Sequence, residues 1–214
     1  MNRSGLTRGF NRSGFADLPS SGDEVRIAAA AFPRQKVDLL VGASATEAAF
    51  KAASVNEYRV IHLAVHAFAD STFPDRAALV LLSDPAAGED GFLQASEIAQ
   101  MRFESDLVIL SACDTAVGPL QGQDGIANLS RAFLEAGART VISTLWEIDD
   151  SSSLFLMKRF YAHLSTGQSA ASALTVAKRD MLRTFGSKAL PYQWAGFTIE
   201  GGAARQTSLN ESHK

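Results

Sequence analysis

One cysteine and one histidine follow two separate apolar runs of the chain. Cys113 is the only cysteine, and it ends the run LVILSAC just before the turn-forming pair Asp114 and Thr115. His66 directly follows the run RVIHLAV. A thiol becomes a nucleophile at neutral pH when a base or a positive neighbour favours its thiolate, and imidazole is such a base. The pair predicts nucleophilic catalysis if the fold brings the two residues together.

Each of these residues also has a structural interpretation. A lone cysteine is often a small buried hydrophobe, and a histidine after a strand is often a core residue with satisfied nitrogens. The structural interpretation is favoured for His62, which lies four residues before His66 on the same run. On a strand these two histidines are about 13 Å apart, too far to share a metal ion. We therefore expect no metal site and no cofactor.

Apolar runs alternate with stretches of helical periodicity along the chain. Strands are predicted at 37–41, 59–65, 78–82, 107–111, 139–145 and 194–199, and helices at 45–54, 93–100, 125–136, 151–165 and about 168–185. The strands are continuous apolar runs, which is typical of a mainly parallel sheet with helices on both faces. Catalytic groups gather at the carboxyl ends of such strands. His66 and Cys113 would then lie at one edge of the sheet.

The composition is that of a globular protein with a substantial core, since 46% of the residues are apolar and 20% are charged. A net charge of −3 gives no electrostatic footprint for nucleic acid. No apolar run approaches the roughly 18 residues of a membrane span. One cysteine cannot form an internal disulfide, which fits a reducing compartment. We expect a cytoplasmic protein that binds neither nucleic acid nor membrane.

Several motifs occur in a characteristic order: VIHLAVHAF, ALVLLS, DGFLQASEI, LVILSACDTAVG and GIANLSRAFLEAGARTVISTLWEIDD. With this order the sequence resembles the CHAT family of caspase-like cysteine peptidases, and through it separase and the caspase-fold clan. A histidine about 50 residues before the cysteine is also the caspase pattern. The resemblance covers residues 23–201 and implies a caspase-like three-layer α/β sandwich, with a mainly parallel sheet and helices on both faces. Flexible segments are expected at 1–22 and 202–214.

The resemblance implies a catalytic dyad. In this family the histidine after the strand and the cysteine of the S-A-C motif act together, so His66 would be the general base and Cys113 the nucleophile. The backbone N–H groups of Cys113 and Ala67 would stabilise the oxyanion. The family usually has glycine at the position of Ala67.

The stretch TLWEIDD resembles the L-W-x-V-x-D segment of the clan. In separase, an acid of this segment lines the pocket for the basic residue before the cleaved bond. The resemblance places Asp150 at that position, with Asp149 beside it. A carboxylate there would select Arg or Lys through charge-assisted hydrogen bonds. Capping of the helix predicted at 151–165 is an equally good interpretation of Asp150.

The expected function is that of a cysteine endopeptidase that cuts a protein or peptide substrate after a basic residue. The alternative is a catalytically silent interaction module. It is favoured by Ala67 and by residues 1–16, which lack the hydrophobic run with which the fold normally begins. Many family members carry helical repeats upstream, so a regulatory partner or helical-repeat module on another chain is also expected. A small-molecule binder is a weaker interpretation, because no glycine-rich loop follows the first strand.

Overall fold

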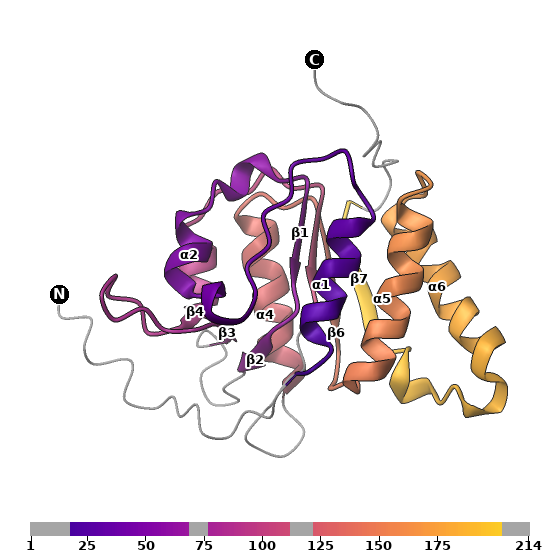
Figure 1. Ribbon diagram of the computed structural model, residues 1–214. Coiled ribbons are helices and arrows are strands. Elements are labelled where there is room, and N and C mark those ends of the chain that lie inside the picture. Colours follow the sequence, from indigo (N-terminus) through magenta and orange to yellow (C-terminus); the bar gives the residue numbers. More distant parts are fainter. Residues whose placement is uncertain (1–17, 69–76, 112–121, 203–214) are drawn as a thin grey trace.

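The computed structural model describes residues 18–68, 77–111 and 122–202 (Figure 1). Its main sheet has the strand order β1 (Val60–Leu63), β5 (Leu107–Leu110), β6 (Thr140–Thr144) and β7 (Phe197–Gly201). The first three strands are parallel, and β7 is antiparallel to β6. A second, antiparallel sheet has the order β2 (His66–Phe68), β3 (Ala78–Val80) and β4 (Phe92–Gln94).

Helices cover both faces of the main sheet, as Figure 1 shows. One face packs against α2 (Glu47–Ala52), α3 (Ala95–Ile98) and α4 (Gly122–Glu135), and the other against α1 (Ser21–Ala30), α5 (Asp150–Leu164) and α6 (Ala170–Phe185). Short 3-10 helices lie at η4 (Gly42–Ser44), η5 (Val55–Glu57), η7 (Gly186–Lys188) and η8 (Pro191–Gln193). The predicted caspase-like α/β sandwich is thereby confirmed.

Strand β5 explains why the predicted strands are continuous apolar runs. Val108 and Leu110 point into the core beside α4, whereas Leu107 and Ile109 point into the core beside α5 and α6. Successive side chains of a strand alternate between its faces, so a strand buried on both faces is apolar throughout. β5 also lies between β1 and β6 in the sheet. The strand that leads toward Cys113 is therefore held by neighbours on every side.

Gly137 shows why α4 ends where it does. Its φ of +110° lies in the left-handed region, and a Cβ at this position would meet the carbonyl oxygen of Phe103 at 2.3 Å. Only glycine combines this backbone with so close an approach. Gly137 therefore shapes the turn that ends α4.

Two predictions about the strands are wrong. Residues 37–41 pair with no strand of the described chain, and the side chains of Val37, Leu39 and Leu40 are exposed. An apolar run forms a strand only where an edge is free to pair with it. The run 59–65 is also interrupted, because β1 ends at Leu63 and His66 begins β2 of the second sheet.

Candidate active site

The two strands that lead toward His66 and Cys113 lie side by side. β1 and β5 pair in parallel, with Leu63 opposite Leu110, and the backbone N–H of Ser111 donates a hydrogen bond to the carbonyl of Leu63 at 3.1 Å. His66 lies three residues after Leu63, and Cys113 lies two residues after Ser111. The parallel pairing that the dyad requires is therefore present.

His66 is half-buried at the start of β2, opposite Val80 of β3. Cys113 lies outside the described residues, as does the segment 112–121 that contains it. The structure therefore describes His66 and the end of β5, which leads toward Cys113. The contact between His66 and Cys113 stays a prediction.

Ala67 follows His66 inside β2, opposite Leu79, and is 1% exposed. A residue within a strand has an extended backbone, which any L-amino acid adopts. Alanine therefore fits this position as well as the glycine usual in the family. The role of its N–H toward an oxyanion stays a prediction.

Asp149 and Asp150 have different roles at the start of α5, just beyond the end of β6. Asp149 is the N-cap: its Oδ1 accepts hydrogen bonds from the Ser152 backbone at 3.0 Å and from the Ser151 hydroxyl at 2.6 Å. Burial raises the pKa of the Asp149 carboxyl, but these hydrogen bonds outweigh burial and leave that pKa below its ordinary value. Because Asp149 caps the helix, Asp150 is not needed for capping.

Asp150 is half-buried and holds the chain before α1. Its Oδ2 accepts a hydrogen bond from the backbone N–H of Ser20 at 2.6 Å. β6 is the neighbour of β5, so Asp150 follows the main sheet at the same edge as the approach to Cys113. Its proximity to a substrate stays a prediction.

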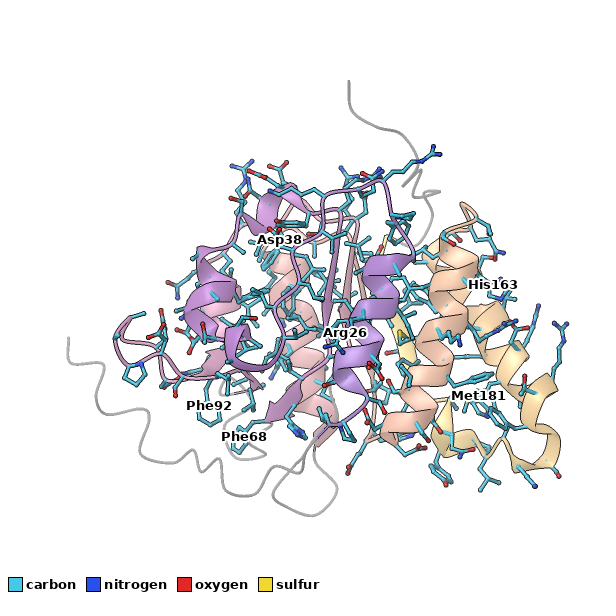
Figure 2. All side chains as sticks on the ribbon, viewed as in Figure 1. Arg26, Asp38, Phe68, Phe92, His163 and Met181 are labelled. Carbon is cyan, nitrogen blue, oxygen red and sulfur yellow. The ribbon has the colours of Figure 1, made fainter. Side chains whose placement is uncertain are left out.

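His163 is far from this edge of the sheet. Figure 2 shows it beside α6, on the opposite side of the molecule from Phe68, which lies two residues after His66. Its Nε2 shares a hydrogen bond of 2.7 Å with Oδ2 of Asp180, and this bond is the main reason that the pKa of Asp180 is below its ordinary value. His163 therefore belongs to the contact between α5 and α6 and is no candidate for the general base.

A buried polar network that the sequence gave no reason to expect lies between α1, β1, β5 and α5. Its centre is the carboxylate of Glu24, which contacts His62 and Ser153; Tyr161 and Ser111 complete it. Burial, together with the charge of Glu24, raises the pKa of Tyr161 well above its ordinary value. Both nitrogens of His62 are bonded within this network, in agreement with its structural interpretation.

Apart from this network, a group of three carboxylates surrounds Lys51. Glu47, Glu89 and Glu97 have oxygens close enough together to hold a metal ion. However, the Lys51 ammonium contacts all three, at 2.7, 2.7 and 2.9 Å. Burial lowers the pKa of Lys51, and the three hydrogen bonds raise it by more, so that it lies above its ordinary value. The positive charge that the carboxylates require is supplied by this lysine.

No helix in the described ranges is both long and apolar enough to cross a membrane. The model of the CHAT domain matches residues 5–202. Tetratricopeptide repeat protein 28 of Mus musculus is 31% identical over 134 residues, which are 63% of this chain and 5% of that protein. Tetratricopeptide repeat protein 28 of Homo sapiens is 28% identical over 127 residues, 59% of this chain and 5% of that protein. The chain thus corresponds to a small part of these relatives.

Proposed function

The chain belongs to the CHAT domain family of the caspase-like peptidase clan, and from this premise we propose that it is a cysteine endopeptidase with a His66–Cys113 dyad. The observation that carries the proposal is the parallel pairing of β1 with β5. This pairing brings the chain segments that lead to His66 and to Cys113 side by side. They meet at the carboxyl ends of the strands, where α/β folds assemble their sites.

The proposed reaction is acyl transfer. His66 accepts the proton of the Cys113 thiol, and the thiolate sulfur bonds to the carbonyl carbon of the peptide. The resulting oxyanion accepts hydrogen bonds from the backbone N–H groups of Cys113 and Ala67. The C–N bond then breaks, the amine leaves with the proton from His66, and water hydrolyses the thioester. These steps require no metal or cofactor.

The proposal includes a preference for Arg or Lys before the cleaved bond, with Asp150 as the selecting carboxylate. We expect Asp150→Asn to lower kcat/KM for an arginyl peptide about tenfold, because a charge-assisted hydrogen bond is replaced by a neutral one. The amide oxygen of asparagine still accepts the Ser20 N–H, so the local structure is retained. Asp149→Asn is the matched control, since asparagine is an equally good N-cap and its effect should stay below twofold. Equal losses in both variants would contradict the selecting role of Asp150.

The direct test is hydrolysis of two fluorogenic peptides that differ only in arginine or glutamate before the reporter group. We expect the wild-type chain to release the reporter from the arginyl peptide and from the glutamyl peptide at least about tenfold more slowly. Equal rates on both peptides would contradict the basic preference. Release from neither peptide, by a chain whose thiol reacts as an ordinary thiol, would contradict the proposed function.

The alternative is a silent interaction module. The observation that favours it is the cluster of exposed apolar side chains at Val37, Leu39 and Leu40, which suits contact with another protein. The relatives are named for tetratricopeptide repeats, which are helical hairpins, so the proposed partner is a helical-repeat module on another chain. A cytoplasmic location, inferred from the single cysteine, is part of the same proposal.

A further inference from the structure

The carboxylate of Glu24 is buried between elements distant in the sequence. Its side chain is 2% exposed, on the face of α1 that packs against β1 and α5 (Figure 1). Oε1 lies 2.8 Å from Nε2 of His62 on β1, and Oε2 lies 3.0 Å from the hydroxyl of Ser153 on α5. A buried charge requires such partners, and each oxygen of Glu24 has a different one.

The direction of the bonds that lead to Glu24 follows from the chemistry of the groups. An ionised carboxylate only accepts hydrogen bonds, so Ser153 donates its single proton to Glu24. Ser153 then accepts from the hydroxyl of Ser111, 2.7 Å away. On the other side, Nε2 of His62 donates to Glu24 at 2.8 Å, and Nδ1 of the same ring shares a hydrogen bond of 2.8 Å with the Tyr161 hydroxyl. The two serine bonds and the bond from Nε2 of His62 point toward Glu24, an arrangement in which each bond of the serine arm strengthens the next.

The two arms of this network end on the two strands that approach the proposed dyad. One arm holds His62, four residues before His66, and the other holds Ser111, two residues before Cys113. We propose that Glu24 is a positioning residue, which acts through His62 and through Ser153 with Ser111 to align the two strand ends for the His66–Cys113 contact. This inference rests on the proposed peptidase function.

The geometry at the end of β5 explains why the serine arm should matter. Among the residues that the structure describes, the backbone bond from Ser111 to Leu63 is the last one between these two strands. The Ser111 hydroxyl anchors this last residue to α5, and through Ser153 to α1. Without that anchor the strand end is free to shift, and a shift of 1 Å in a reacting group lowers a rate by up to about 100-fold.

The test is the pH dependence of iodoacetamide alkylation of the single thiol, in the wild-type chain and in Ser111→Ala and Ser153→Ala. We expect both variants to alkylate about tenfold more slowly at pH 7 and to have an apparent thiol pKa nearer the ordinary value of about 8.5. Ser143→Ala is the matched control, because Ser143 is a buried serine on the neighbouring strand β6 whose nearest hydroxyl partner, Thr198, lies at 3.4 Å. A thermal melt of each variant verifies that the assay temperature lies within the folded range.

The outcomes separate the inference from the proposed function. A low thiol pKa in the wild-type chain and in Ser143→Ala, raised in both network variants, supports the positioning role. A low thiol pKa in all four proteins overturns the positioning role and leaves the dyad intact. An ordinary thiol in all four overturns the dyad, and the positioning role fails with it.

Discussion

Replacement of Cys113 by alanine is expected to lower kcat/KM for the arginyl peptide by at least about 1,000-fold, because the covalent route is lost with the sulfur. His66→Ala should cause a loss of similar size, since an unassisted thiol is mostly protonated at neutral pH. The double variant should be little worse than either single variant, because the two residues act as one unit. The measurement is initial-rate release of the fluorogenic reporter at pH 7.

The control for this prediction is His163→Asn, which removes a second imidazole far from the proposed site. Its kcat/KM should stay within twofold of the wild-type value. If the activity survives in Cys113→Ala, or if the losses of the two single variants multiply in the double variant, the dyad mechanism is wrong.

Loss of the central carboxylate is the second large effect. Glu24→Ala removes the acceptor of two buried hydrogen bonds and leaves His62 and Ser153 without it. A buried donor left without its acceptor costs about 1–3 kcal/mol, so loss of the acceptor for two such donors should lower the free energy of unfolding by about 2–6 kcal/mol. Urea unfolding at pH 7, followed by far-UV circular dichroism, measures the change.

A surface glutamate provides the comparison. Glu104 makes an ion pair with Arg102 in which both side chains are well exposed, so Glu104→Ala should change the free energy of unfolding by no more than about 0.5 kcal/mol. An equally small change for Glu24→Ala would mean that the buried network contributes little to stability.

Local sequence patterns predicted most strands and helices of the main sheet. Helices cover both faces of this sheet, so its central strands are apolar throughout. Continuous apolar runs predicted β5 and β6, and helical periodicity predicted α4. The run 37–41 is equally apolar, but pairing depends on a neighbouring strand, which the run itself cannot reveal. The antiparallel second sheet was missed for the same reason, since apolar runs do not specify strand direction.

The residues of the candidate site also differ in how far the sequence reveals them. His66 and Cys113 are proposed from the sequence because each comes at the end of a strong apolar run and because the motifs around them resemble those of one family. Glu24 was missed because its contact with Ser153 joins residues 129 positions apart. In the sequence it is one acid in the first turn of α1, a place that the helix dipole alone would explain.

The most direct test of the dyad is alkylation of the single thiol by iodoacetamide from pH 5 to 9, in the wild-type chain and in His66→Ala. It needs neither a substrate nor an activator. We predict rapid alkylation with an apparent thiol pKa well below the ordinary value of about 8.5, and a return toward that value in His66→Ala. Slow alkylation that follows an ordinary thiol and is unchanged in His66→Ala would contradict the proposed dyad.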